Sequence, residues 1–418
     1  MELYDQKPYL HPHPSDQPIN RIQPSKQRRR STPPHNPEFE LYSLYRDDDD
    51  PRASSSTLRE YTHLDNPYEV YRTRNHIRGS EFFGTCNGLV CLAAEDIELT
   101  TLVWNPSIRK FVILPKSGVT FCHGYGREAR CAFGYDRRAN DYKVLRRVSC
   151  FQEGKFISCP YEIWSLAKGS WKTLNTGNDR HHHERDIEQR DFDAGHPPAF
   201  VNGALHWVQV NVNTQNISIG SFDMSDEVFG KITTPPEAGT QKCFGSDPHC
   251  VVSRYRESLA FFESSEERRE SVGCGWLLHM TMWVMKEYGV AKSWDKLFAI
   301  CLEGSICRLV GCRKSGDEVV LKLIVDNVQY RSVNSKTKQV KNLQIKGSCC
   351  YSVMDAFTES LVLLDQPNLL KVPFPSVAVV GVMTVPPVEC AVFTGVSFRG
   401  VSLHGWWSPY PRLVLPLS

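Results

Sequence analysis

The chain has 418 residues, of which 41% are hydrophobic, 11% aromatic and 23% charged. Such a composition is typical of a chain that buries a sizeable core, and it excludes collagen and wholesale disorder. The formal net charge is only +2, from 49 Lys and Arg against 47 Asp and Glu. We therefore expect neither nucleic acid nor a membrane surface as a partner, because no strong field of either sign would attract them.

Residues 1–37 are rich in Pro, Gln, Ser, Arg and His and show no apolar periodicity. This pattern predicts a disordered, basic and proline-rich leader. The run Lys26–Arg30 has three interpretations, a nuclear address, a phosphate-contacting patch or a solvated run, and in a disordered leader we favour the solvated run.

Cysteine is frequent at 15 residues, but the number is odd and no secretory signal opens the chain. We expect reduced, mostly buried thiols and a location in the cytoplasm or nucleus. The spacing of Cys301, Cys307 and Cys312 is one that alternating strands produce without any metal. The sequence predicts no metal site, no cofactor and no catalytic residue.

From residue 38 to residue 366 the chain consists of short apolar or alternating runs separated by turn residues, which predicts one all-β domain. The predicted strands include 88–92, 102–104, 111–114, 161–166, 204–210, 217–222, 282–285 and 319–325. Residues 367–418 are predicted to be a poorly ordered C-terminal tail. Within that tail, residues 372–388 carry no charge, but four prolines in so short a run argue against a membrane span.

One hairpin pattern recurs five times, and four of its aromatic anchors, Trp104, Trp164, Phe222 and Trp283, follow at intervals of 60, 58 and 61 residues. This repeat favours a β-propeller over a β-sandwich. We expect six blades, the sixth a composite in which strands around 39–44 pair with 352–364, since joining the two ends removes exposed strand edges. The aromatic anchors are interpreted as core between blades and not as ligand contacts.

The hairpins contain a series of short motifs in a fixed order, beginning with residues 84–92 and 104–110 and ending with 359–362. The motif residues, all interpreted as structural, are Asn87, Gly88, Trp104, Asn105, Pro106, Gly134, Tyr135, Asp136, Asn202, Gly203, His206, Trp207, Phe222, Asp223, Trp283 and Trp294. This order resembles that of plant F-box-associated domains over about 330 residues, so the chain is identified as a suspected member of that kelch-like family.

The resemblance implies a non-catalytic protein-binding module, the substrate-recognition part of an F-box subunit of a cullin-RING (SCF) ubiquitin ligase. Its partner would be a protein substrate, which the sequence does not identify. The alternative is a propeller enzyme such as a metal-dependent hydrolase, which would need Asp, Glu, Asn or His side chains converging on the central channel.

The ligase adaptor is a further partner expected for the family, and it binds the leucine-rich helices of an F-box. The leader contains only two leucines, Leu3 and Leu10, amid many prolines. We therefore expect that the chain as given does not bind the adaptor with useful affinity. It would then act as a substrate-binding protein or as a competitor of full-length relatives.

Several motifs consist of residue types that favour tight turns. Asn87-Gly88 favours a turn with positive φ, and Asn105 and Asp223 have side chains that can bond their own backbone. A basic cluster, Arg137, Arg138, Lys143, Arg146 and Arg147, is interpreted as the solvated face of a hairpin or, alternatively, as a rim that contacts an acidic partner. The sequence does not assign the partner-binding residues.

Overall fold

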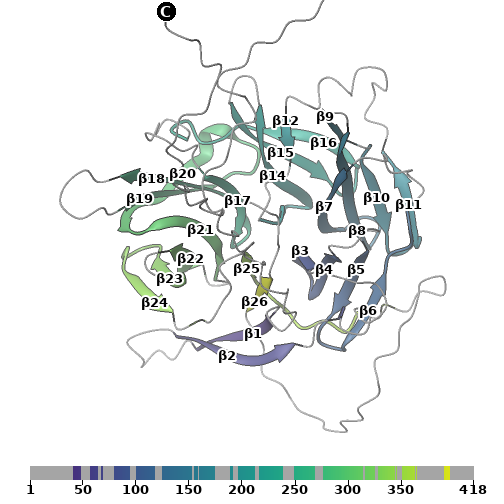
Figure 1. Cartoon of the computed structure of the whole chain (residues 1–418), viewed down its shortest axis with the longest axis horizontal. Helices are drawn as coiled ribbons and strands as arrows, with labels where there is room; N and C mark the ends of the chain where they lie inside the picture. Colours follow the sequence, from purple (N-terminus) through teal and green to yellow (C-terminus); the bar gives the residue numbers. More distant parts are fainter. Residues whose placement is uncertain are drawn as a thin grey trace, which may run out of the picture. The chain divides into compact units, whose positions relative to one another are not determined.

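A computed structural model gives the arrangement of the strands (Figure 1). The structure describes residues 41–48, 57–64, 67–68, 80–94, 100–117, 125–152, 155–158, 160–174, 189–191, 196–211, 216–238, 249–268, 276–313, 316–324, 328–343, 345, 351–362, 364 and 390–395. These residues all belong to the unit that runs from Pro37 to Ser418. The predicted leader, its basic run and the uncharged stretch 372–388 lie outside the described residues.

Five antiparallel sheets are each built from one continuous stretch of chain, and they give the propeller-like arrangement of blades that the hairpin repeat predicts. Blade 1 contains β3 (Ser80–Cys86), β4 (Leu89–Ala94), β5 (Thr101–Asn105) and β6 (Lys110–Ile113). Blade 2 contains β7 (Tyr125–Asp136), β8 (Asp141–Gln152), β9 (Lys155–Ser158), β10 (Glu162–Ser165) and β11 (Ser170–Thr173). Blade 3 contains β12 (Gln189–Asp191), β13 (Ala199–Val201), β14 (Ala204–Asn211), β15 (Ile217–Asp223) and β16 (Val228–Ile232).

The last two blades follow in the same way. Blade 4 contains β17 (His249–Tyr255), β18 (Ser258–Arg268), β19 (Trp276–Met285), the short helix η3 (Ala291–Ser293) and β20 (Trp294–Glu303). Blade 5 contains β21 (Ser305–Cys312), β22 (Glu318–Ile324), β23 (Val328–Asn334) and β24 (Val340–Leu343). The all-β, propeller-like class predicted from the sequence is therefore confirmed for the described residues.

The predicted count of six blades is not supported, because five blades are seen and the expected pairing of the ends differs. A separate sheet has the order β2 (Thr57–Leu64), β1 (Leu41–Asp48), β26 (Cys390–Gly395) and β25 (Tyr351–Asp355). Strand β1 pairs with β26, from Leu41 opposite Thr394 to Tyr45 opposite Cys390, and not with the 352–364 segment. Strand β26 comes from the stretch that the sequence pattern assigns to the tail.

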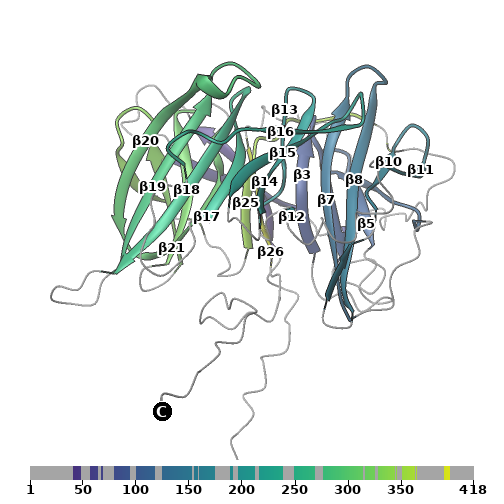
Figure 2. The same ribbon diagram turned by 90° about the horizontal axis from the view of Figure 1, so that it is seen from above.

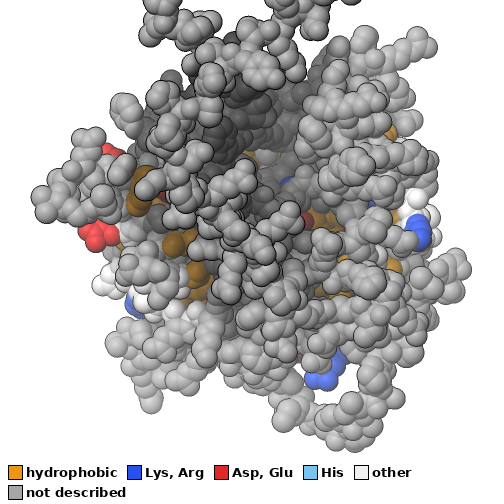
Figure 3. Space-filling view, in the orientation of Figure 1, with side chains coloured by type: hydrophobic (Ala, Val, Ile, Leu, Met, Phe, Trp, Pro, Cys, Tyr) orange, Lys and Arg blue, Asp and Glu red, His pale blue; other side chains and the backbone are white. Residues whose placement is uncertain are grey.

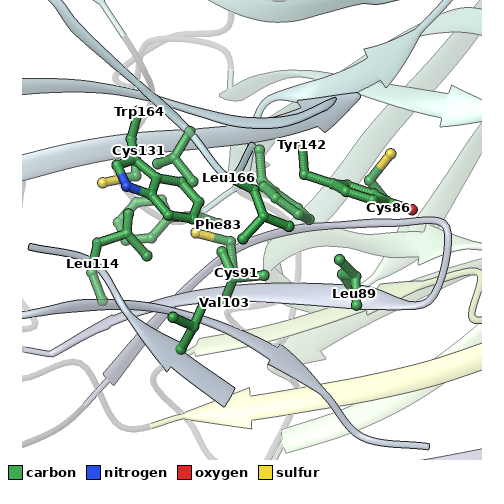
Figure 4. Packing of buried hydrophobic residues seen from close by; sticks show 14 of the residues in the cluster. Phe83, Cys86, Leu89, Cys91, Val103, Leu114, Cys131, Tyr142, Trp164 and Leu166 are labelled. Carbon is green, nitrogen blue, oxygen red and sulfur yellow. The ribbon is translucent and has the colours of Figure 1, made fainter. Parts of the chain in front are cut away.

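The aromatic anchors are buried between neighbouring sheets, as the hairpin repeat predicts. Trp164 is fully buried and packs with Phe83, Cys91 and Val103 of blade 1 (Figure 4). Trp104, Phe222 and Trp283 are at most 5% exposed in the equivalent positions. Burying each large ring removes roughly 150–250 Å² from water, so these contacts hold adjacent sheets together.

Each blade has two short hairpin turns at the same edge, because the first and third strands of an antiparallel meander end together. A residue with positive φ occurs in each of the ten turns: Asn87 and Gly88, Arg109, Asn140, Gly169, Asn202 and Gly203, Glu227, Arg256, Gly289, Gly316 and Lys338. We call this edge the turn face; Figure 2 shows the blades from the side. The turns at Asn87-Gly88 (φ 48° and 78°) and Asn202-Gly203 (φ 51° and 78°) confirm the predicted turn chemistry.

Six cysteines are free thiols. Cys86, Cys91, Cys131, Cys250 and Cys312 are buried, whereas Cys301 is exposed. Among the described residues, we find no helix long and apolar enough to cross a membrane.

Candidate functional site

The inner strands of the blades surround a recess at the axis of the propeller. It is lined by residues from several of these strands, including Thr85 of β3, Arg254 of β17 and Asp355 of β25. His196 and Phe200, just before and within β13, complete the polar and aromatic parts of the lining. Residues that lie far apart in the sequence thus meet at one place.

Asp355 organises one wall of the recess. Its Oδ2 atom accepts a hydrogen bond of 2.6 Å from Oγ1 of Thr85, and its Oδ1 atom accepts one of 2.8 Å from the backbone N–H of Ala356. Arg254 approaches the same carboxylate at only 3.5 Å, with its side chain 36% exposed and that of Asp355 29% exposed. The carboxylate is held firmly, whereas the guanidinium is a loose partner that keeps donors free for another group.

His196 contributes a buried acceptor. Its Nδ1 atom lies 3.1 Å from the carbonyl oxygen of Pro197, which can only accept, so the ring proton resides on Nδ1. Burial lowers the pKa of His196 to about 4, so the ring is neutral at neutral pH. The buried Nε2 atom has no hydrogen-bond partner among the described residues. A buried acceptor without a hydrogen-bond partner destabilises the folded chain. A ligand that donates a hydrogen bond to this atom would remove the destabilisation.

Phe200 occupies the apolar side of the recess because Gly134 makes room for it. A Cβ atom at Gly134 would lie 2.8 Å from the ring of Phe200 and 3.3 Å from Cε of Met224. The family motif that contains Gly134, interpreted as structural, thus places an aromatic ring beside Arg254 and His196 in the lining. Together the recess offers an aromatic surface, a cation, a carboxylate and a neutral acceptor.

The closing segment, residues 356–362, connects the recess to blade 1. The side-chain amide of Asn105 donates to the carbonyl oxygens of Ser360 (3.0 Å) and Val362 (3.1 Å), and Ser107 Oγ accepts from the N–H of Ser360 at 3.1 Å. A Cβ atom at Gly88 would lie 2.1 Å from the carbonyl oxygen of Thr358. The turns of blade 1 therefore fix the segment that follows Asp355.

The interpretation of the basic cluster as a solvated hairpin face is wrong for Lys143, Arg146 and Arg147, which are buried, whereas Arg137 and Arg138 are exposed. Lys143 is buried and pairs with Asp136 at 2.8 Å and with Glu227 of blade 3 at 2.9 Å. Arg146 is buried and pairs with Glu162 at 3.0 Å. Of the cluster, Arg138 pairs with Asp226 at an exposed position. Lys143 and Arg138 thus have carboxylate partners in blade 3, which charge counting along the sequence cannot detect.

The remaining motif residues stabilise turns and contacts between blades. The side-chain Oδ1 atoms of Asn105, Asp136 and Asp223 each accept backbone N–H groups two residues further on, at 2.8–3.0 Å. Buried His206 lies 2.8 Å from the hydroxyl of Tyr288 in blade 4. Trp294 donates through Nε1 to the carbonyl oxygen of Thr233 at 2.9 Å. Tyr135, Pro106 and Trp207 also lie in or next to these hairpins.

None of the motif residues named above lines the recess, although Phe133, which precedes Gly134, does. His196, Arg254 and Asp355 were missed by sequence reasoning, because none stands in a motif or a recognisable spacing. Within the described residues, no group of three or more His, Cys, Asp or Glu is placed to hold a metal ion.

Comparison with known proteins identifies the fold. Residues 51–361 match the model of the F-box associated beta propeller domain. F-box protein At4g22390 of Arabidopsis thaliana is 25% identical over 72% of this chain and 74% of its own length. F-box protein CPR1 is 25% identical over 72% of each chain, and F-box/kelch-repeat protein At3g23880 is 27% identical over 52% of each; both are from the same plant. With its motifs in family order and its match covering most of the propeller, the chain belongs to the F-box associated beta propeller domain family.

Proposed function

We propose that the propeller is a non-catalytic protein-binding module that recognises substrates for a cullin-RING ubiquitin ligase, acting in the cytoplasm or nucleus. Family membership supports this proposal, because the similar proteins are named F-box proteins. The substrate inserts a side chain into the recess at the axis.

The observation that carries this proposal is the unsatisfied chemistry of the recess. Among the described residues, the Nε2 atom of His196 lacks a hydrogen-bond partner, and Arg254 holds its carboxylate loosely and remains one-third exposed. Binding energy at protein interfaces concentrates in such central positions, where arginine and aromatic side chains are enriched. Arg254 and Phe200 supply both kinds of side chain on a rigid scaffold.

The recess is a binding site and not a hydrolase centre in this proposal, because its groups suit recognition. Asp355 is already bonded by Thr85 and the backbone, so it is poorly placed to act as a free base. A partner that presents a hydrogen-bond donor to His196 and a carboxylate or carbonyl to Arg254, next to an apolar group, would satisfy all three features.

Affinity capture from plant cells, with the ligase inhibited so that substrates accumulate, tests the proposal. Wild-type chain, Arg254→Ala and Lys168→Ala would be compared by quantitative mass spectrometry; Lys168 is an exposed cation in a turn of blade 2. We expect proteins that are captured by wild type and Lys168→Ala and lost with Arg254→Ala. Capture of the same proteins by all three would contradict recognition through the recess.

The alternative function, a metal-dependent hydrolase, is tested on the purified wild-type protein. Elemental analysis would measure the metal bound per chain after extensive dialysis. Stoichiometric metal retained at a defined affinity would favour a metal-dependent hydrolase and contradict the proposal.

A further inference from the structure

An exposed cysteine, a histidine and a glutamate form a connected triad on the outer part of blade 4. The Sγ atom of Cys301 lies 3.1 Å from Nδ1 of His279, and Nε2 of His279 lies 2.8 Å from Oε2 of Glu267. None of the three residues lines the recess at the axis. The triad is therefore separate from the proposed partner-binding site.

The sheet register places the three side chains on one surface. His279 of β19 is directly opposite Cys301 of β20, and on its other side it is opposite Ser265 of β18, two residues before Glu267. Directly opposed and diagonal residues of antiparallel strands share a face of the sheet. The contact thus follows from three adjacent strands, whose positions Figure 1 shows.

The hydrogen bonds assign a role to each group. A carboxylate only accepts, so His279 donates its Nε2 proton to Glu267 and keeps the lone pair of Nδ1 directed at the Cys301 thiol. A nucleophile bonded to a base that is oriented by a third group is the arrangement that activates thiols. The two outer groups contact opposite nitrogens of the ring, so the three do not converge on a single metal ion.

We propose that Cys301 is a modification site for small, uncharged α,β-unsaturated carbonyl compounds. The thiol proton passes to Nδ1 of His279, the sulfur electron pair forms an S–C bond to the β-carbon, and the C=C π pair moves to the α-carbon. The imidazolium then returns the proton to the α-carbon. The product is a thioether, and the addition needs no leaving group, oxidant or reductant.

The exposure of Cys301 and the charge of nearby side chains determine which electrophiles reach the thiol. Cys301 is exposed, as are Glu267, at 61% of its side chain, and Glu303, two residues further on the same strand face. Acidic side chains are visible in Figure 3 at the edge where Figure 1 labels β18 and β19. The negative charge of Glu267 on this face disfavours anionic reagents and leaves uncharged electrophiles unaffected.

Timed labelling of the full chain with acrylamide at pH 7.4 tests the proposal, with peptide mass spectrometry to follow Cys301 separately from every other cysteine. We expect His279→Gln to slow labelling of Cys301 at least about tenfold, because the base is lost. Glu267→Gln should slow it by a smaller factor. Glu287→Gln serves as the matched control, since it removes an exposed carboxylate from the turn of the same blade without touching the triad.

Labelling of Cys91, which is fully buried, reports within the same samples whether each variant is folded. A rate for Cys301 in folded His279→Gln within twofold of wild type would overturn the proposal. So would a wild-type rate no faster than that of Cys91. Slower labelling of Cys301 in His279→Gln, together with an unchanged labelling rate in Glu287→Gln, supports the proposal.

Discussion

Two clusters of charged side chains, one between blades 2 and 3 and the other at the axis of the propeller, differ in how completely their groups are paired. Between blades 2 and 3, buried Lys143 contacts Asp136, Glu227 and the carbonyl oxygen of Met224, all within 2.9 Å. At the axis, Arg254 contacts Asp355 at 3.5 Å, and His196 Nε2 has no hydrogen-bond partner in the part of the chain that the structure describes. Similar residue types thus hold the fold at one place and leave binding capacity at the other.

This difference shows that charge alone does not mark a functional site. Asp136 also accepts a hydrogen bond of 2.7 Å from Ser225, so its cluster is satisfied without any partner. A saturated cluster has nothing left to offer a substrate, whereas an incomplete one does. The following substitutions separate stability from binding on this basis.

The largest effect is expected from breaking the saturated cluster. Lys143→Met removes the cation that lies between the buried carboxylate of Asp136 and the partly buried carboxylate of Glu227, and it should lower the free energy of unfolding by about 3–5 kcal/mol. Chemical denaturation measures the loss. Lys168→Ala, an exposed cation in a neighbouring turn, should change it by less than about 0.5 kcal/mol. A loss below about 1 kcal/mol for Lys143→Met would contradict the structural role.

A matched pair of glycines tests how the closing segment is anchored. Gly88 and Gly203 share a φ of 78°, but a Cβ atom at Gly88 meets the Thr358 carbonyl, whereas at Gly203 it meets nothing within 4 Å. Gly203→Ala should cost about 1–2 kcal/mol from backbone strain alone. Gly88→Ala should cost about 2 kcal/mol more, because the displaced segment loses hydrogen bonds from Asn105. Equal losses in the two variants, measured by denaturation, would mean that the segment is not anchored there.

A smaller effect is expected on the pH dependence of the unfolding free energy, through Asp136 of the saturated cluster. Burial opposes ionisation of Asp136, but the hydrogen bonds from Lys143, Ser225 and the Ala139 N–H outweigh it and lower the pKa from 3.8 to about 2. A carboxyl whose pKa is lower in the folded state stabilises the fold above its unfolded value. This contribution is present above about pH 4 and disappears as the pH falls towards 2. The unfolding free energy of Asp136→Asn should therefore fall less steeply than that of wild type over this range, and parallel curves would refute the assignment.

The smallest effect on stability is expected at the recess. Arg254→Ala breaks a partly exposed pair of 3.5 Å, and the loss in unfolding free energy should stay below about 1 kcal/mol. Thermal or chemical denaturation measures it. A loss as large as that of Lys143→Met would mean that the recess, too, is a structural cluster.

Local chemistry made much of the fold predictable from the sequence. Asn-Gly pairs favour the positive φ of tight hairpin turns, and Asn105 and Asp223 bond backbone groups only two residues away, so the hairpins can be recognised without tertiary information. The aromatic anchors could be assigned to the core because their regular interval marks equivalent positions. Such features depend on neighbours in the chain.

The parts that could not be predicted depend on contacts between distant residues. Thr85 bonds Asp355 across 270 positions, and Arg254 reaches the same carboxylate across 101. Pairing of β26 with β1 likewise joins residue 390 to residue 45. Nothing in the local pattern of His196, Arg254 or Asp355 distinguishes them from other polar residues, because the recess exists only once the inner strands have come together.

Binding of a captured partner to purified variants tests the central claim most directly. Isothermal titration would give Kd for wild type, Arg254→Ala and Lys168→Ala, with each variant checked for unchanged stability. Recognition through the recess predicts that Arg254→Ala weakens binding at least about tenfold, or about 1.4 kcal/mol, while Lys168→Ala does not. A Kd for Arg254→Ala within twofold of wild type would contradict the claim that the recess binds the partner.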